Sequence, residues 1–427
     1  MHDRGAEARG PDNEDEYRIS ELGACELPRD AVTEQDHARL KQLANRGLLS
    51  LTRSGSGWEV KTESVVGILV LDRIRLIIEP KLLIDGERLM TWLSYAQDVE
   101  PTHLSTPRRW QVTSQGLPDL VVAALEGECR KLLRGRLRRD YRERNRTDTV
   151  LRGQLDLRQQ ATRRFGMLDK LHLHTHEHEV AVWENLVCRV ALERAAVVAR
   201  DPALVRSVRE LAAQFPSDPT FGARSAKEAL RRRQHHRMNR WYRPAHTWAA
   251  LLLNGGGPSD LLVDAGLTAG SLLLNTYRLW ESVVRRMVAQ AVADSAGTVV
   301  QPTGSRAINI AESGPPRPFP VDVLVEWSTG GRTRWLPVDA KYKAYQGTSL
   351  RNDDAHQVLT YASAYSGDRA VVLYPAHGPS YREAKISGPL GPLARLHLIG
   401  IDVSRQPAEC AAALAEHLEP PRDATAQ

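Results

Sequence analysis

Three charged residues in the C-terminal half of the 427-residue chain have the types and spacing of a hydrolytic metal site. Asp339 and Lys341 stand two residues apart in an apolar segment that reads as a strand, so their side chains project from one face. Asp322 belongs to the preceding predicted strand, and a hairpin loop over 328–333 would bring it beside Asp339. Two carboxylates this close repel each other unless a cation joins them, and oxygen ligands suit Mg²⁺ or Mn²⁺. We therefore predict a divalent-metal site on two adjacent strands, with the carboxyl groups within about 6 Å of each other.

The lysine is an unusual choice, because the chain contains 9 Lys and 49 Arg. Two of these lysines, Lys341 and Lys343, stand together. A lysine beside a bound metal can hold or polarise the water that attacks phosphorus, whereas arginine is larger and almost never deprotonated. A short Asp-x-Lys triplet is also typical of a solvated strand with alternating charge, so the triplet alone leaves both interpretations open.

Two further patterns favour the catalytic interpretation. Glu281 shares a helical stripe with three residues spaced three or four positions apart: Tyr277, Val284 and Val288. The apolar neighbours would bury this face, where a carboxylate is costly unless it meets a cation. Gln357 and Tyr361 are four residues apart on the helix predicted after the lysine strand, so both are available to one edge of the site.

The surrounding pattern predicts the elements that must position these side chains. A long amphipathic helix over 271–294 carries Glu281, and a second helix over 353–365, with Asn352 as its N-cap, carries Gln357. Strands are predicted over 321–327, 334–343, 369–374 and 396–403. The order helix, strand, strand, helix, strand, strand is typical of an α/β domain with a mixed central sheet, which we expect over 266–418.

The rest of the chain completes a multidomain α+β protein. Residues 17–160 read as a β-rich domain, with strands over 58–60, 65–71 and 75–79 between helices over 33–46 and 118–133. Residues 161–265 read as a helical connecting region, with helices over 180–198 and 202–214 and a break at the glycines and proline of 254–258. The polar ends, 1–16 and 419–427, are expected to be disordered tails.

Several segments together resemble the PD-(D/E)xK nuclease fold, whose order is helix, three strands, helix, strand. More narrowly, the chain is similar to the McrC family, the nuclease subunit of McrBC-type modification-dependent restriction systems. The C-terminal segments that carry the resemblance are Leu-Trp-Glu at 279–281, Val-Asp-Val-Leu at 321–324, Val-Asp-Ala-Lys-Tyr-Lys at 338–343 and Gln-Val-Leu-Thr-Tyr-Ala at 357–362. The N-terminal ones are Val-Gly at 66–67, Ile-Glu-Pro-Lys at 78–81, Tyr141 and Leu-Arg-Gly-Gln-Leu-Asp at 151–156. In one departure, Val321 stands between Pro320 and Asp322, whereas the superfamily has Pro directly before the first Asp.

The resemblance implies a role for each matching residue. Asp322 and Asp339 would bind the metal, Mg²⁺ or Mn²⁺. Lys341 would hold the attacking water, and Glu281 would support the site or help to hold a second metal. Three further residues would be structural or DNA-facing: Gln357, Tyr361 and Lys343.

The resemblance also implies partners. McrC-like subunits dock onto a ring of McrB-like AAA+ GTPase subunits, which recognises modified DNA of the 5-methylcytosine type, so reading the modification would belong to the partner. This chain has no Gly-x-x-x-x-Gly-Lys-Ser/Thr loop, and we expect it not to hydrolyse GTP. We expect residues 17–160 to dock on the ring and double-stranded DNA to be the substrate. Two alternatives stay open: a stand-alone nuclease of the same fold in DNA repair, and a catalytically silent DNA-binding adaptor of a GTPase.

The composition excludes other classes of protein. No apolar run approaches the roughly 20 residues that cross a bilayer, and 1–16 lack the apolar stretch of a signal peptide. We therefore predict a cytoplasmic protein without a membrane partner. The cysteines, at positions 25, 129, 188 and 410, lack the paired spacing of a disulfide framework or a zinc ribbon. The net charge of +6 permits a nucleic-acid partner without requiring one.

Two remaining patterns have alternative interpretations. Basic residues cluster over 130–152 and 224–243, which favours phosphate contact for at least one cluster, although the first could instead contact the GTPase ring. His172, His174, His176 and His178 alternate along a predicted strand and would share one face. Because residues on one strand face are about 7 Å apart, a polar edge is favoured over a zinc site.

Overall fold

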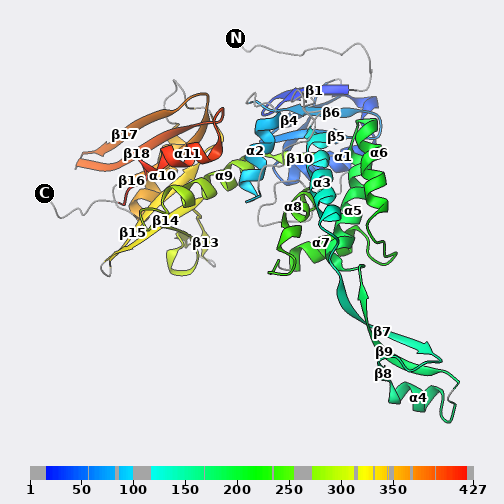
Figure 1. The fold of residues 1–427 in the computed structure, drawn as a ribbon. Helices are drawn as coiled ribbons and strands as arrows, with labels where there is room; N and C mark the ends of the chain where they lie inside the picture. The colour runs from blue at the N-terminus through cyan, green and yellow to red at the C-terminus, as the bar shows by residue number, and fades with distance from the viewer. Residues whose placement is uncertain are drawn as a thin grey trace. The chain divides into compact units, whose positions relative to one another are not determined.

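The computed structural model describes residues 16–55, 57–81, 86–99, 117–167, 169–232, 235–253, 272–311, 316–329, 332–343, 345, 351–365, 369–389 and 391–420. The chain forms two compact units. The first unites Met1–Pro101, Arg108–Leu120 and Ser259–Gln427, and the second unites Thr102–Pro107 and Val121–Pro258. Helices and sheets occur in both (Figure 1), so the protein is of the mixed α/β class, as expected. Within these ranges no helix has the length and apolar character needed to span a membrane.

These units divide the chain differently from the expected domains. The strands of 17–99 belong to the first unit, whereas residues from Val121 onward, including a hairpin that crosses position 160, belong to the second. The expected domain boundaries at 160 and 265 therefore remain a prediction about which segment carries which function. The break at 254–258 and most of both expected tails lie outside the described residues.

The first sheet takes its strands from two distant parts of the sequence. Its order is β1 (Glu16–Ser20), β6 (Arg75–Glu79), β5 (Val65–Val70) and β10 (Leu272–Asn275), with β1 parallel to β6 and the other pairs antiparallel. Gly67 permits the close approach of β10, because a Cβ atom there would lie 2.1 Å from the Leu272 carbonyl oxygen. Packed against this sheet are helix α1 (Glu34–Asn45) and a small antiparallel sheet of β2 (Ala24–Pro28), β4 (Gly57–Thr62) and β3 (Leu49–Arg53).

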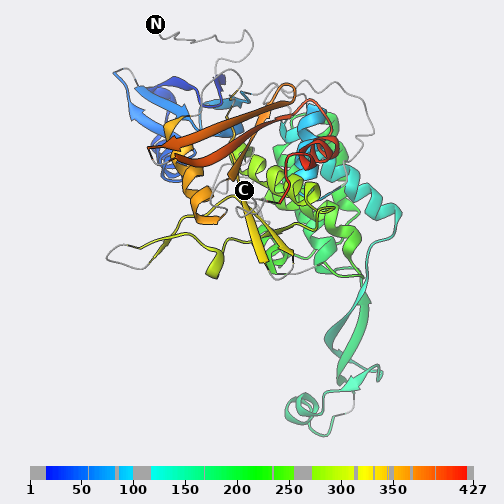
Figure 2. The same ribbon diagram turned by 90° about the vertical axis from the view of Figure 1, so that its left-hand side faces the viewer.

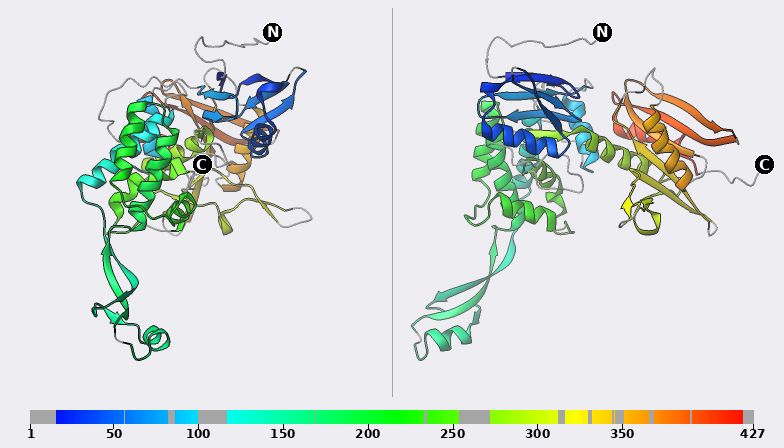
Figure 3. Two further views of the ribbon diagram at one scale, coloured as in Figure 1. Left: turned by 90° about the vertical axis from the view of Figure 1, so that its right-hand side faces the viewer. Right: turned by 180° about the vertical axis from the view of Figure 1, so that it is seen from behind.

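The C-terminal part of the first unit holds a six-stranded sheet that is mixed, as expected. Its order is β11 (Thr298–Val300), β14 (Val323–Thr329), β15 (Arg332–Ala340), β16 (Arg369–Ala376), β18 (Gly391–Asp402) and β17 (Ser380–Gly388). Strands β15, β16 and β18 are parallel, and the outer pairs are antiparallel. Helix α10 (Asn352–Tyr365) covers one face, and helices α9 (Thr276–Ala291) and α11 (Pro407–Ala415) lie on the other (Figures 2 and 3).

Smaller elements complete the first unit. Helix α2 (Gly86–Ala96) packs on α9. Strands β12 (Asn309–Ile310) and β13 (Arg317–Pro318) pair with each other outside the large sheet. Short 3₁₀ turns occupy Arg29–Ala31 and Gly304–Arg306.

Several boundaries differ from the expected ones. The helix expected from 271 begins at Thr276, because residues 272–275 pair with β5 and Asn275 caps the helix. Asn352 is the first residue of α10 and not its N-cap. Strand β15 ends at Ala340, three residues before its expected end. Strand β17 has no counterpart among the expected strands, because its mostly exposed, polar side chains give no apolar stripe.

The second unit combines helices with a long hairpin (Figure 1). Its helices are α3 (Leu117–Arg134), α5 (Trp183–Val198), α6 (Pro202–Ala213), α7 (Ala223–Arg232) and α8 (Arg243–Leu253), with a 3₁₀ turn at Arg240–Tyr242. Strands β7 (Asp140–Asp148) and β9 (Leu171–Glu179) pair over their full length and project away from the helices. They carry β8 (Gln154–Leu155) and α4 (Leu157–Arg163) at the far end. We call residues 140–179 the arm.

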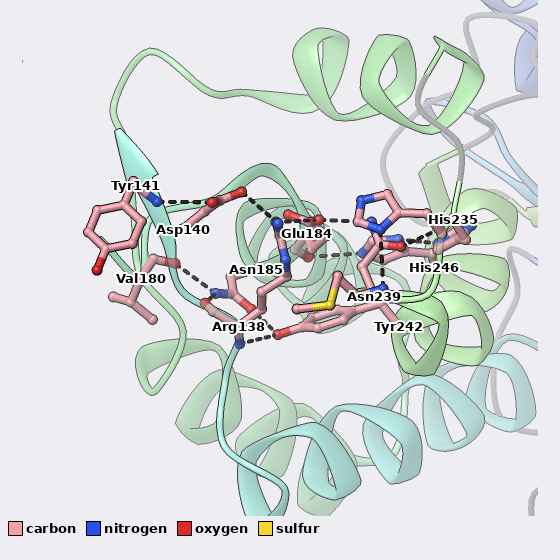
Figure 4. A network of polar contacts seen from close by, with 12 residues as sticks. Arg138, Asp140, Tyr141, Val180, Glu184, Asn185, His235, Asn239, Tyr242 and His246 are labelled. Carbon is pink, nitrogen blue, oxygen red and sulfur yellow. Dashed lines mark hydrogen bonds and ion pairs between the residues drawn. The ribbon is translucent and has the colours of Figure 1, made fainter. Parts of the chain in front are cut away.

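Buried polar contacts anchor both strands of the arm to the helices (Figure 4). Asn185 Nδ2 donates to the main-chain carbonyl oxygens of Arg138, at 2.8 Å, and Val180, at 2.7 Å, just outside the two ends of the arm. Arg138 Nη1 lies 2.8 Å from Glu184 Oε1, and Asn239 Nδ2 donates to the same oxygen at 2.9 Å. Glu184 is fully buried, so this ion pair lies in a surrounding of low dielectric constant. The root of the arm is therefore held by hydrogen bonds from helix α5.

We expect Glu184→Ala to lower the free energy of unfolding by about 3–5 kcal/mol, because it removes the buried partner of the Arg138 guanidinium. Urea denaturation of the full chain measures this change. Glu193→Ala is the matched control, because Glu193 pairs with Arg189 near the surface of the same helix and its loss should cost less than about 1 kcal/mol. Equal effects of the two substitutions would contradict the anchoring role of Glu184.

Candidate active site

Asp322 and Asp339 meet where β14 and β15 pair. Val323 and Val338 are partners in the antiparallel register, and continuing this register by one residue sets the two aspartates opposite each other. Ala340 N–H donates to Asp322 Oδ2 at 2.8 Å, and the negative charge of Asp322 acts on Asp339. The structure thus brings both carboxylates together, with Asp339 in β15 and Asp322 directly before β14, which begins two residues later than expected.

The negative charges of this pair are costly to bury. Asp339 is 1% exposed, and its Oδ1 atom has no hydrogen-bond partner among the residues that the structure describes. Burial raises the pKa of Asp339 to about 7, and the negative charge of Asp322 acts in the same direction. Burial also raises the pKa of Asp322 to about 6. A buried acceptor oxygen without a donor, beside a second carboxylate, is suited to a bound cation.

Lys341 lies beside the carboxylates although β15 ends one residue before it. Its main-chain N–H donates to the Leu373 carbonyl oxygen at 2.9 Å, so this segment remains attached to β16. Its Nζ atom lies 3.1 Å from Asp339 Oδ2 and donates to Gln357 Oε1 at 2.7 Å. The predicted same-face relation of Asp339 and Lys341 is therefore present in the fold.

A hydrogen-bonded chain connects Lys341 to the turn before β14. Gln357 Nε2 donates to the Tyr361 hydroxyl oxygen at 2.8 Å, and that hydroxyl donates to the Pro320 carbonyl oxygen at 2.7 Å. Val321, the residue that departs from the superfamily pattern, is buried against Tyr361. Because Tyr361 is itself buried, the structure favours a structural role for it over a DNA-facing one.

Helix α9 faces the same site. Burial raises the pKa of Glu281, while the positive charges of Arg278 and Arg285 lower it and the negative charge of Asp339 raises it. The pKa of Asp322, raised mainly by burial, is raised further by the charge of Glu281. Arg285 Nη2 donates to the main-chain carbonyl oxygen of Asp322 at 2.6 Å. Glu281 thus lies within electrostatic reach of the carboxylate pair, and α9 holds the main chain that carries Asp322.

Asp354 also belongs to this cluster, although its sequence pattern does not single it out. Lys343 Nζ lies 3.1 Å from Asp354 Oδ1, the Tyr345 hydroxyl donates to Oδ2 at 2.6 Å, and Lys341 Nζ lies 3.9 Å away. Burial alone would raise the pKa of Asp354, but these donors hold it below its ordinary value. In the sequence Asp354 reads as one of the acidic residues favoured in the first turn of a helix. Its spacing of three residues from Gln357 is the signal that places both on one helical face.

The residues present fit an ion of the Mg²⁺ type. Asp339 is buried and Asp322 is half-buried, and the Oδ1 atom of Asp339 has no donor within the described ranges. No group of three or more His, Cys, Asp or Glu side chains in those ranges is arranged to hold a metal ion. Mg²⁺ is commonly held by one or two carboxylates, with water and substrate phosphate completing its coordination, so the aspartate pair suffices. A role of Glu281 in holding a second metal stays a prediction.

A family model described as McrBC 5-methylcytosine restriction system component matches residues 60–375. The chain belongs to this family. Membership in the McrBC family confirms the resemblance that the sequence motifs predict.

Solved structures were also compared with the chain by their fold. The chain is similar to a chain of the refined half-complex from the tetradecameric assembly of Thermococcus gammatolerans McrB AAA+ hexamers with bound McrC. The two share 13% identity over 94% of this chain and 100% of that chain, with a TM-score of 0.64, which shows a common fold. A chain of the cryo-EM structure of the Thermococcus gammatolerans McrBC complex has 16% identity over 65% of this chain and 88% of its own length, with a TM-score of 0.45. No curated protein matches.

The remaining sequence patterns of this McrBC family protein lie in its second unit. The four histidines alternate along β9, and His174 Nε2 lies 3.1 Å from Asp156 Oδ2. No group that could hold a metal ion includes them in the described part of the chain. In the first basic cluster, Arg138 binds Glu184 and so holds the arm. Phosphate contact by the other basic residues stays a prediction.

We expect Asp339→Asn to raise the melting temperature of the metal-free protein, because it removes a buried negative charge that lies beside a second carboxylate. The pKa of Asp339 is higher in the folded than in the unfolded protein, so its contribution to stability is full below about pH 4 and is lost as the pH rises through about 7. The gain of the variant over the wild type, measured by calorimetry in EDTA, should therefore widen from pH 5 to pH 8.

The effect of Mg²⁺ on the melting temperature provides a second test of the same carboxylate pair. Added Mg²⁺ should raise the melting temperature of the wild type and leave that of Asp339→Asn nearly unchanged. Asp353→Asn, at an exposed position in the first turn of α10, is the control and should behave as the wild type does. A lower melting temperature for Asp339→Asn than for the wild type at pH 8 would contradict the repulsion between the two aspartates.

Proposed function

We propose that this protein is the metal-dependent DNA endonuclease subunit of a GTP-dependent restriction complex directed at modified DNA of the 5-methylcytosine type. Its nuclease domain, over 266–418, would have the PD-(D/E)xK fold, and the protein would act in the cytoplasm. The observation that carries the proposal is the juxtaposition of Asp322 with the buried Asp339, with the Lys341 ammonium group 3.1 Å from Asp339. Membership in the McrBC family supports the restriction context.

The residues of the site divide the work of phosphodiester hydrolysis. Asp322 and Asp339 would hold Mg²⁺ or Mn²⁺, which when bound supplies positive charge to the phosphate and lowers the pKa of water. Gln357 and Asp339 orient the Lys341 ammonium group, which has three N–H bonds and so keeps a donor for the attacking water or a phosphate oxygen. Its charge favours the negative charge that develops on the phosphate oxygens. Gln357 is a positioning residue, because it acts through Lys341.

We further propose that the chain works with an AAA+ GTPase ring similar to McrB. Support comes from the common fold with a chain of a structure that contains McrB AAA+ hexamers with bound McrC. The chain itself has no phosphate-binding loop signature for GTP. In this division of labour the ring reads the modified base and hydrolyses GTP, and this chain cuts double-stranded DNA.

The arm, which begins inside the expected docking segment 17–160 and continues beyond it, is a candidate docking surface. Three apolar side chains near its far end are strongly exposed: Leu157 (72%), Phe165 (86%) and Met167 (59%). Exposed apolar side chains gathered on a projecting element are typical of a surface that binds another protein. Because β7 and β9 pair across position 160, a fragment that ends there would separate the two strands, and the docking test needs the full chain.

With the partner GTPase, GTP and Mg²⁺, the protein should cut modified DNA, and EDTA should abolish cutting. Asp339→Ala and Lys341→Ala should each lower the rate by about 100-fold or more, because one removes a metal ligand and the other removes a positively charged hydrogen-bond donor to the attacking water or the phosphate. Lys385→Ala, at an exposed position of β17, is the control and should cut normally. Cutting without GTP or partner would favour the stand-alone nuclease. Undiminished restriction by Asp339→Ala would favour the silent adaptor.

Replacing Leu157, Phe165 and Met167 together by Ser should weaken binding to the GTPase ring at least about tenfold, because the apolar contact area is lost. Binding is measured by interferometry with the full chain, and stimulation of GTP hydrolysis should fall in parallel. Leu393→Ser, an exposed apolar position in β18, is the control and should bind normally. Normal binding by the triple variant would return the docking role to the sheets of 17–99.

A further inference from the structure

Glu21 is a buried carboxylate that joins distant segments of the first unit. It directly follows β1 and is 2% exposed. Its Oε2 atom accepts hydrogen bonds from the Lys81 main-chain N–H, at 3.1 Å, and from the Tyr342 hydroxyl, at 3.4 Å. Its Oε1 atom accepts a hydrogen bond from the Thr276 hydroxyl. The Glu21 side chain therefore contacts both the first residue of α9 and the segment that follows β15, and each of these leads into the candidate site.

The contact with Thr276 lies at the first turn of α9. The strand before it, β10, belongs to the first sheet, so the helix starts at the edge of that sheet (Figure 1). From this start α9 carries Glu281, which faces the aspartate pair, and Arg285, which donates to the main chain of Asp322. A displacement of Thr276 would move both side chains relative to Asp322.

The contact with Tyr342 lies between the two lysines of the site. Lys341 contacts Asp339 and Gln357, whereas the neighbouring Tyr342 side chain contacts Glu21. The chain has left β15 at this point, and the Lys341 main-chain N–H makes the last bond to β16 in the described part of this segment. The Tyr342 hydroxyl is thus the next anchor after the strand ends.

A buried glutamate at position 21 lowers the stability of the fold relative to an apolar residue that would fill the same space. Burial raises the pKa of Glu21, and the hydrogen bonds of Thr276, Lys81 and Tyr342 offset this only in part. An ionised acceptor makes shorter and stronger hydrogen bonds to hydroxyl groups than a neutral one does. The carboxylate therefore binds the Thr276 hydroxyl closely and the Tyr342 hydroxyl through a longer contact, at a cost in stability that a well-packed apolar residue would avoid.

We propose that Glu21 is a positioning residue of the candidate active site. By binding Thr276 and Tyr342 at once, it holds Glu281 and Lys341 in place relative to the aspartate pair. The catalytic consequence rests on the proposed function. The first sheet is then a part of the nuclease site and not a separate module.

The test compares Glu21→Gln with the wild type as full-length proteins, with the partner GTPase, GTP, Mg²⁺ and modified DNA. We expect the single-turnover cutting rate at saturating DNA to fall about 10- to 100-fold, because small displacements of catalytic groups have effects of this size. The DNA concentration for the half-maximal rate should not change, because Glu21 is buried. Tyr342→Phe should act in the same direction and add little to Glu21→Gln. Glu79→Gln is the control, because Glu79 pairs with Arg18 at the surface of the same sheet.

Hydrogen exchange provides a readout that does not depend on cutting. Amides of 276–285 and 339–343 should exchange faster in Glu21→Gln than in the wild type or in Glu79→Gln, and amides of β16 and β18 should not. Unchanged exchange in both segments overturns the proposal, as does an unchanged cutting rate. Exchange that rises uniformly, with cutting reduced only in proportion to lost folded protein, also overturns it. A wild type that does not cut refutes the proposed function instead, and exchange then decides the role of Glu21.

Discussion

Repulsion between the neighbouring carboxylates of Asp322 and Asp339 governs the surroundings of the candidate site. The pairing of β14 and β15 brings Asp322 and Asp339 together, and every neighbouring contact reduces their mutual repulsion only in part. The Ala340 amide serves one oxygen of Asp322, and the Lys341 ammonium group lies beside one oxygen of Asp339. The Oδ1 atom of Asp339 remains without a hydrogen bond in the described part of the chain. A structure that leaves such groups uncompensated gives up stability, which a bound cation would restore.

Arginine and lysine side chains have different roles around the site. Arginine, with its planar fork, serves as an anchor: Arg285 binds the main chain of Asp322, and Arg138 binds Glu184 at the root of the arm. Lysine, a compact charge on a flexible stem, occurs where the carboxylates of the site lie. In a chain that uses arginine about five times as often, this placement separates the groups that hold the fold from those suited to chemistry.

Local patterns predicted much of the candidate site, and long-range pairing accounts for what they missed. The alternation of a strand was enough to set Asp339 and Lys341 on one face, and helical spacing was enough to direct Glu281 toward the site. The pairing of β10 with β5 leaves no local signal, because the partners are about 200 residues apart in sequence. The arm was missed as a unit for another reason: its strands are polar and lack the apolar stripe that marks a sheet with a buried face. Glu21 was missed because a buried acid next to a turn looks, in sequence, like any solvated one.

The position of β10 in the first sheet has a consequence for synthesis of the chain on the ribosome. When β5 and β6 emerge, the strand that will cover the other edge of β5 has not been made, and the whole second unit is translated first. At about 5–20 residues per second, the intervening 200 or so residues take about 10–40 s. Throughout that interval β5, five of whose six residues are buried in the finished protein, presents an open apolar edge to other nascent chains. Translation speed through the second unit therefore sets how long the first sheet is exposed to aggregation.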